Sequence, residues 1–182
     1  MSKENVALIQ GIYDAFAKGD VAGVMGRMSD DIIWTEAENF PYADGNPYVG
    51  PQAIAAGVFA RCGSEWDGFT VAIDEMLDAG DTVIALGRYK GTYKATGRPQ
   101  NTQLVHVWRI ANGKAVRFQQ YADTLQVARV IATGNAVWAE APHALADSEA
   151  LGARPEIKSV DRNADAARKA AENGMSHPLR SP

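Results

Sequence analysis

The chain has 182 residues, a net charge of -4 and 46% hydrophobic residues, which is typical of one globular domain with an extension. The mild acidity argues against nucleic-acid binding, and no apolar segment approaches the roughly 18 residues of a membrane span. A single cysteine, Cys62, and an N-terminus without a signal-peptide pattern predict a reducing, cytoplasmic location.

The first third of the chain shows three helical patterns. Residues 3–18 carry apolar side chains at helical spacing. Asp20 can cap a second, short helix that runs to about Met28. Proline is favoured at the first position of a helix, so a third helix is predicted from Pro51 to about Cys62.

Strand patterns lie between and after these helices. Residues 31–36 read DIIWTE, an alternating run with β-branched and aromatic side chains, and residues 37–50 form a loop rich in Pro, Gly and Asn. From residue 69 onward, four apolar segments separated by turn residues predict successive hairpins. Helices followed by a run of antiparallel strands indicate an α+β fold.

The composition changes after residue 132. Residues 133–182 are rich in Ala, Pro and polar residues, with one plausible helix at 164–173. We therefore expect a folded domain over residues 1–132 and an extension over 133–182 that is partly helical or flexible. Trp138 motivates the hypothesis that the extension packs across the partner subunit or the cavity mouth, because a solvated tail seldom carries tryptophan.

The hairpin at residues 104–123 carries the clearest chemical signal. Asn112-Gly113 as a two-residue turn pairs His106 with Gln119. Because side chains alternate along a strand, this register predicts one face that consists of Leu104, His106, Trp108, Gln119, Tyr121 and Asp123. Such a mixture of polar and aromatic groups suits the wall of a ligand cavity.

Each of these residues also has a structural explanation. A lone histidine in a strand is usually a structural or surface residue, and Asp123 at a strand end can simply cap the next turn. Another turn register would change which side chains share a face. On a flat ladder, His106 and Asp123 share a wall without touching.

About residues 5–130 contain three segments whose order and spacing carry a resemblance to a known family. The segments are YDAFAKGDVAGVMGRMSDDIIWTE, VGPQAIAAGVF and TGRPQNTQLVHVWRIANGKAVRFQQYAD. In these segments the chain resembles the SnoaL-like and ketosteroid-isomerase-like group of the nuclear-transport-factor-2-like superfamily. The resemblance implies a cone-shaped, curved antiparallel sheet wrapped by three N-terminal helices around a deep cavity. It also implies a homodimer that pairs through the outer sheet face.

The resemblance implies site residues by position. Glu36 matches the general base of ketosteroid isomerases, and His106 stands where those enzymes have a carboxylic acid donor. Their tyrosine aligns with Ile12, so Tyr13 is expected to point elsewhere. In SnoaL-like polyketide cyclases, a histidine and an aspartate on the late strands act on an enolisable carbonyl compound. His106 and Asp123 resemble that pair, which implies a general acid/base role for Asp123 and a polarising role for His106.

A third chemistry, epoxide hydrolysis as in limonene epoxide hydrolases, uses an Asp-Arg-Asp group on this fold. Arg88 and Asp123 match two of its members, but Lys90 stands where the other aspartate should be.

The predicted function is therefore cofactor-independent isomerase or cyclase chemistry on a small hydrophobic carbonyl compound, without metal, nucleic acid or membrane. The alternative is a non-catalytic module of the same fold that binds small molecules or dimerises. The predicted catalytic residues are Asp123, His106 and Glu36. The predicted ligand contacts are Trp34, Tyr42, Phe59, Tyr89, Trp108, Gln119 and Tyr121.

Overall fold

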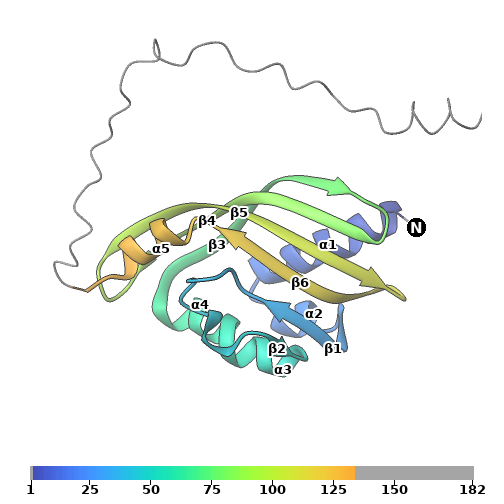
Figure 1. Cartoon of the computed structure of the whole chain (residues 1–182), viewed down its shortest axis with the longest axis horizontal. Coiled ribbons are helices and arrows are strands. Elements are labelled where there is room, and N and C mark those ends of the chain that lie inside the picture. The colour runs from blue at the N-terminus through green and yellow to red at the C-terminus, as the bar shows by residue number, and fades with distance from the viewer. Residues whose placement is uncertain (1, 134–182) are drawn as a thin grey trace, which may run out of the picture. The chain divides into compact units, whose positions relative to one another are not determined.

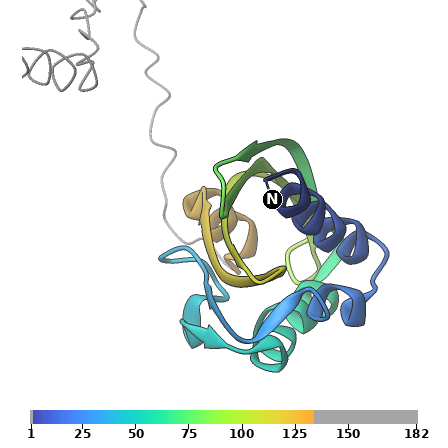
Figure 2. The same cartoon turned by 90° about the vertical axis from the view of Figure 1, so that its right-hand side faces the viewer.

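The structure, a computed structural model, describes residues 2–133 of the chain (Figure 1). The helix predicted over 164–173 and Trp138 lie outside the described residues. Among residues 2–133, no helix is long and apolar enough to cross a membrane. The described residues form a mixed α+β fold, in which one curved sheet is partly wrapped by short helices (Figures 1 and 2).

The sheet has six strands in the order β2-β1-β6-β5-β4-β3. All neighbours are antiparallel except β1 and β6, which run parallel, so the expectation of a purely antiparallel sheet is corrected at this one pair. Figure 2 shows how strongly the long strands curve. The strands are β1 (Met28–Thr35), β2 (Tyr48–Val49), β3 (Trp66–Asp78), β4 (Thr82–Tyr93), β5 (Arg98–Ala111) and β6 (Lys114–Ala122).

The helices follow the apolar patterns of the sequence. The first prediction is confirmed by α1 (Ser2–Ala17), which packs against β3 and β4 through a buried stripe that includes Ile9 and Ile12. The second is α2 (Val21–Met25), where the Asp20 side chain accepts a hydrogen bond from the Gly23 amide at 2.8 Å.

The third predicted helix is longer than expected and is not uniform. It consists of α3 (Pro51–Ile54), a π-helical turn η2 (Ala55–Phe59) and α4 (Ala60–Glu65). The loop before it contains a short 3₁₀ turn, η1 (Ala43–Gly45). Turns of π-helix are rare and often occur at functional sites, and this one ends on Phe59, whose ring packs against Trp34.

A β-bulge in the last hairpin corrects the predicted register. Ala111 pairs with Lys114 as expected, and Asn112 and Gly113 both adopt the positive φ that this turn requires. Between the pairs Arg109–Arg117 and Ile110–Ala115, however, β6 carries one extra residue. His106 therefore pairs with Gln120 instead of Gln119, and the two faces of β6 are exchanged beyond the bulge.

A short helix that the sequence reading did not predict, α5 (Thr124–Ile131), follows β6. The Asp123 carboxylate caps it by accepting a hydrogen bond from the Gln126 amide at 3.0 Å. Val127 and Val130 are its buried residues. Asp123 thus takes the capping role that was its structural alternative.

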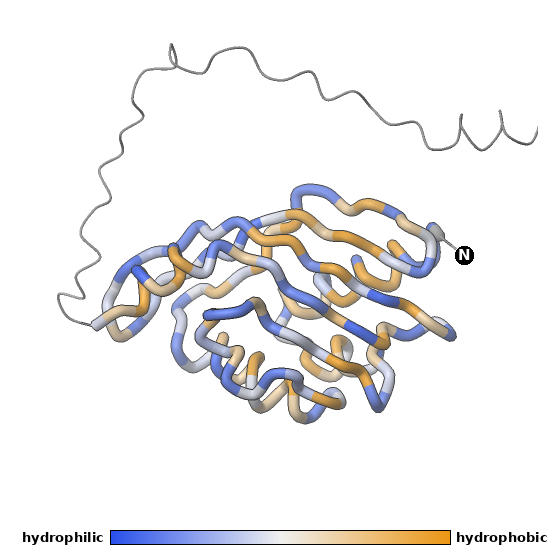
Figure 3. The backbone as a smooth tube through the Cα atoms, in the orientation of Figure 1, coloured by the Kyte–Doolittle hydropathy of each residue, from blue (hydrophilic) through white to orange (hydrophobic). Residues whose placement is uncertain are grey.

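Hydropathy follows this architecture. In Figure 3 hydrophobic stretches run along the strands and α1, and hydrophilic stretches gather at turns. The buried core contains many aromatic residues, and Trp34, Trp108 and Phe118 stack or meet edge-on within 5.5 Å between ring centroids. Aromatic side chains therefore fill much of the space that the curved sheet encloses.

Candidate active site

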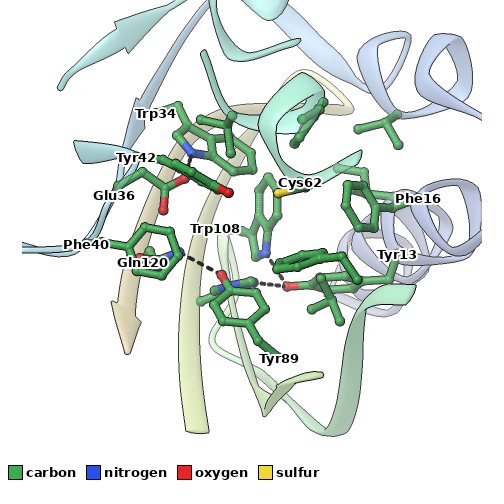
Figure 4. Close-up of a pocket in the computed structure, with 17 residues that line it drawn as sticks. Tyr13, Phe16, Trp34, Glu36, Phe40, Tyr42, Cys62, Tyr89, Trp108 and Gln120 are labelled. Atoms are coloured by element: carbon green, nitrogen blue, oxygen red, sulfur yellow. Dashed lines mark hydrogen bonds between the residues drawn. The ribbon is translucent and has the colours of Figure 1, made fainter. Parts of the chain in front are cut away.

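The candidate site is an inner cavity between the sheet and the helices (Figure 4). Side chains from α1, α2, β1, the loop that follows β1, η2, α4 and β3–β6 line it. Its free volume is about 50 Å³, which is small beside the roughly 300–1,000 Å³ of typical ligand pockets. Among the lining side chains, Glu36 supplies the one carboxyl group and His106 the one imidazole.

His106 lies in the middle of a buried hydrogen-bond network. Its Nδ1 is 2.8 Å from the Tyr13 hydroxyl and its Nε2 is 2.6 Å from the Tyr89 hydroxyl. Trp108 Nε1 donates to the Tyr13 oxygen at 2.9 Å, and Gln120 Nε2 donates to the Tyr89 oxygen at 2.7 Å. Both imidazole nitrogens and both tyrosine oxygens are therefore occupied.

Burial fixes the protonation of this network. Desolvation lowers the pKa of His106 to about 3, so the imidazole is neutral at physiological pH. Desolvation also raises the pKa of Tyr13 and of Tyr89, so both phenols keep their protons. The network therefore consists of neutral groups.

Counting hydrogens shows that the network holds one spare donor. A neutral imidazole donates through one nitrogen and accepts through the other, so His106 donates to one tyrosine and accepts from the other. The tyrosine that receives the imidazole N–H already accepts from Trp108 or Gln120, and its own hydroxyl hydrogen has no partner within the network. The tautomer of His106 decides which tyrosine can offer this hydrogen to a ligand.

Glu36 is the second polar group of the inner cavity and is paired differently. It directly follows β1 and is only 2% exposed. Its Oε1 accepts a hydrogen bond from Trp34 Nε1 at 2.6 Å, while its Oε2 is buried without a hydrogen-bond partner. Desolvation, only partly offset by that hydrogen bond, raises the pKa of Glu36 to about 7.

Two amide side chains hold the backbone around Glu36. Asn46 accepts from the Glu36 amide at 2.9 Å and donates to the Glu36 carbonyl at 2.8 Å. Gln120 accepts from the Ala37 amide at 3.1 Å and donates to Tyr89. Gln120 therefore links the backbone beside the carboxylate to the tyrosine network. Figure 4 shows Glu36 and Tyr13 on opposite sides of the lining residues, with Tyr89 between them.

The loop that covers the cavity is held by Arg61 on α4. The guanidinium lies 4.2 Å from the Tyr42 ring centroid, and it forms ion pairs with Asp44 at 2.9 Å and Glu65 at 3.2 Å. The Tyr42 hydroxyl accepts from Trp66 Nε1 at 2.8 Å and donates to Glu65 at 3.1 Å. These contacts keep the Tyr42 ring in the cavity wall.

Comparison with known proteins shows the family and the fold of the chain. The profile of the SnoaL-like domain matches residues 9–118, more than half of the chain. The chain belongs to the SnoaL-like family. The resemblance drawn from the three sequence strings is thereby confirmed. No curated protein matches the chain.

Solved structures share the fold of this SnoaL-like chain. An NTF2-like protein from Burkholderia thailandensis is 41% identical, with a TM-score of 0.68, over 71% of this chain and 98% of its own. An NTF2-like protein of unknown function from Burkholderia pseudomallei is 29% identical, with a TM-score of 0.66, over 71% and 98%. TerC, co-crystallised with polyporic acid, is 26% identical, with a TM-score of 0.64, over 70% and 97%.

Most of the predicted site residues of this SnoaL-like domain lie together. Glu36 and His106 both line the inner cavity. Among the predicted ligand contacts, five also line it: Trp34, Tyr42, Phe59, Tyr89 and Trp108. Their contact with a ligand stays a prediction.

Three predicted site residues lie elsewhere, and the bulge in β6 is the cause. Tyr121 is 57% exposed, and with Asp123 it lines a shallow depression on the sheet that does not share a residue with the inner cavity. Gln119 is half-buried and outside the lining. The prediction that these side chains share a wall with His106 is wrong, because one extra residue reverses the face of each later position.

Two residues of the hydrogen-bond network around His106 were missed, Tyr13 and Gln120. Tyr13 was expected to point away but lies in the inner cavity beside Ile12. On a helix, adjacent positions can both face a concave sheet when the apolar stripe is wide, and the stripe of α1 did include Tyr13. Gln120 was not among the predicted site residues, and the bulge brings its side chain inside. Among residues 2–133, no group of three or more His, Cys, Asp or Glu residues is placed to hold a metal ion.

Proposed function

We propose that this SnoaL-like protein is a cofactor-independent enzyme of the isomerase or cyclase kind, which moves protons on a small hydrophobic carbonyl compound. The observation that carries the proposal is the Glu36 carboxyl group, with one unpaired buried oxygen and a pKa raised to about 7. A base with a pKa near the working pH is well matched to proton transfer.

Glu36 and the His106 network have different roles in the proposed reaction. Ionised Glu36 takes a proton from the carbon next to the substrate carbonyl, and the C–H electron pair forms an enolate. The spare tyrosine hydroxyl of the His106 network donates a hydrogen bond to the enolate oxygen. Protonated Glu36 then returns its proton to the same carbon or to another carbon of the conjugated system, so protons and charge balance.

Proton exchange tests the proposal without knowledge of the natural substrate. A panel of small ketones and diketones is incubated with the full chain in D₂O, and deuterium incorporation next to the carbonyl is followed by NMR. Wild type is expected to accelerate exchange in at least one compound. Glu36→Gln is expected to lower that rate by about 100-fold or more, the usual contribution of a general base.

Asp123→Asn is the matched control, because it also replaces a carboxylate by its amide. Asp123 lies outside the inner cavity lining, and asparagine is equally good as a helix cap, so exchange is expected to continue at the wild-type rate. Loss of exchange in Asp123→Asn, with exchange kept in Glu36→Gln, would overturn the assignment of the base.

The second candidate function is a non-catalytic module that binds a small molecule. The small free volume and the pairing of both His106 nitrogens favour it. TerC, which was co-crystallised with polyporic acid, supports small-molecule binding under either proposal. If ketones bind to wild type but their deuterium exchange is not accelerated, the protein is a non-catalytic binding module.

We further propose a homodimer in the cytoplasm, formed through the outer sheet face, with residues 133–182 as an extension of the domain over 1–132. Exposed apolar side chains on β1, β2 and β6, namely Ile33, Val49 and Tyr121, support a protein interface there. Light scattering on the full chain and on a chain without residues 134–182 tests both points. A monomer for the full chain would overturn the dimer.

A further inference from the structure

The inner cavity adjoins a second, larger hollow, the vestibule. The vestibule has a free volume of about 340 Å³ and shares five lining residues with the inner cavity. Its other lining residues come from the loop after α1, from α2, from α4 and from the start of β3: Gly19, Val21, Gly63, Trp66 and Gly68. The two spaces are therefore neighbours in the same part of the fold.

Three aromatic rings separate the two spaces. Phe16, Phe59 and Phe69 line both, and the Phe16 ring is 5.5 Å from Phe59 and 6.4 Å from Phe69 between centroids. All three side chains are half-buried, in contrast to the fully buried Trp108 behind them. Rings at a partly exposed position can rotate at lower cost than rings inside the core.

The chemistry of the two spaces differs. The inner cavity holds Glu36, His106 and the tyrosine hydroxyls but only about 50 Å³ of free volume, enough for a few small groups. None of the residues that line the vestibule is charged. A ligand that places its reacting group beside Glu36 must therefore put the remainder of its structure somewhere else, and the vestibule is the adjoining space.

We propose that the vestibule is the binding subsite for an uncharged, apolar tail of the substrate, whose carbonyl end enters the inner cavity past the rings of Phe16, Phe59 and Phe69. This inference rests on the proposed function for the identity of the head group, and it names the substrate class as an elongated carbonyl compound. Together the two spaces reach the lower end of the usual volume range for ligand pockets.

Gly63 offers a way to fill the vestibule without disturbing the inner cavity. It lies on α4 with an ordinary helical backbone, and a Cβ added there meets no atom within 4 Å. Because Gly63 lines the vestibule, Gly63→Leu adds a side chain at its wall, and loss of a helical glycine favours the helix. The matched control is Ser64→Leu, at the next position of α4, which is exposed and lines neither space.

The test measures dissociation constants by ligand-observed NMR for a homologous series of straight-chain methyl ketones, from butanone upward. For wild type and Ser64→Leu, affinity is expected to rise about fourfold for each methylene buried, until the vestibule is full. For Gly63→Leu, the affinity for butanone is expected to stay unchanged and the rise with chain length to disappear. Val21 is 43% exposed and lines the vestibule but not the inner cavity. Val21→Glu is therefore expected to weaken the binding of long ketones selectively.

A flat series in wild type overturns the proposal, as does an equal loss for short and long ketones in Gly63→Leu, or the same loss in Ser64→Leu. The series is also measured with Glu36→Gln. A normal dependence on chain length in that variant, together with wild-type protein that does not exchange protons, would refute the proposed catalysis and leave the vestibule assignment intact.

Discussion

The two polar groups of the inner cavity, His106 and Glu36, are equally buried but are paired in opposite ways. Each nitrogen of His106 has a tyrosine partner. Glu36 has a partner for one oxygen and none for the other. Burial alone therefore does not determine how a group behaves.

The difference shows which group is built to react. A neutral network in which both imidazole nitrogens are paired is rigid and already oriented, which suits stabilisation of a developing charge. A half-paired carboxylate with a raised pKa is held at a cost in stability, and such groups are enriched at functional sites. We interpret the His106 network as the fixed part of the site and Glu36 as the part that changes protonation.

The largest expected effect lies on the acid side of the stability curve. The pKa of His106 falls from 6.5 in the unfolded chain to about 3 in the fold. At pH values between these two pKa values, His106 is protonated in the unfolded state but not in the folded state. Stability is therefore lost as pH falls, by up to about 5 kcal/mol.

Urea unfolding of wild type and His106→Gln at pH 7 and pH 4 measures this loss. The variant is expected to be less stable than wild type at pH 7, and this difference is expected to shrink at pH 4, because only wild type loses the stability that His106 contributes. Parallel curves for the two proteins would show that His106 titrates normally.

The next effect has the opposite sign and overlaps the first in pH. The pKa of Glu36 rises from 4.5 to about 7, so the contribution of Glu36 to stability is complete below pH 4.5 and is lost as pH rises to about 7, by about 3 kcal/mol. Glu36→Gln should remove this decline, so that the variant is more stable than wild type at pH 8. A variant that is less stable at pH 8 would contradict the unpaired oxygen.

A smaller effect tests whether the two tyrosines act as one network. Tyr13→Phe leaves the Trp108 N–H without its partner, and Tyr89→Phe does the same to Gln120, each at a cost of about 1–3 kcal/mol. Because both hydroxyls bind His106, the double variant should differ from the sum of the single ones by about 0.5 kcal/mol or more. Strict additivity in urea unfolding would mean two independent hydrogen bonds.

The smallest effect is expected at Asp123, a carboxylate outside the inner cavity. Asp123 caps α5, so replacement by alanine should lower the free energy of unfolding by about 1 kcal/mol and replacement by asparagine should leave it almost unchanged. Thermal unfolding of both variants measures the difference. Equal losses in the two variants would mean that the carboxylate charge matters, as it does for Glu36.

Much of the fold could be predicted, because its helices and strands follow local apolar spacing. The stripe of α1, the proline at the start of α3 and the Asn112-Gly113 turn each act over a few residues. Glu36 and His106 were identified by position, and both face the cavity. The face of Gln119 and Gln120 could not be predicted, because a bulge depends on how β6 meets β1 and β5 together.

The sequence by itself determined the family, the order of the elements and the two polar groups that face inward, since these depend on short-range patterns and on matched strings. The tertiary structure decided which groups pair and how much space remains. The Tyr13–His106 contact joins residues 93 positions apart, and Oε2 of Glu36 is buried without a hydrogen-bond partner because of how distant segments pack around it. Pairing, free volume and pKa follow from packing between distant segments, and no local pattern contains that information.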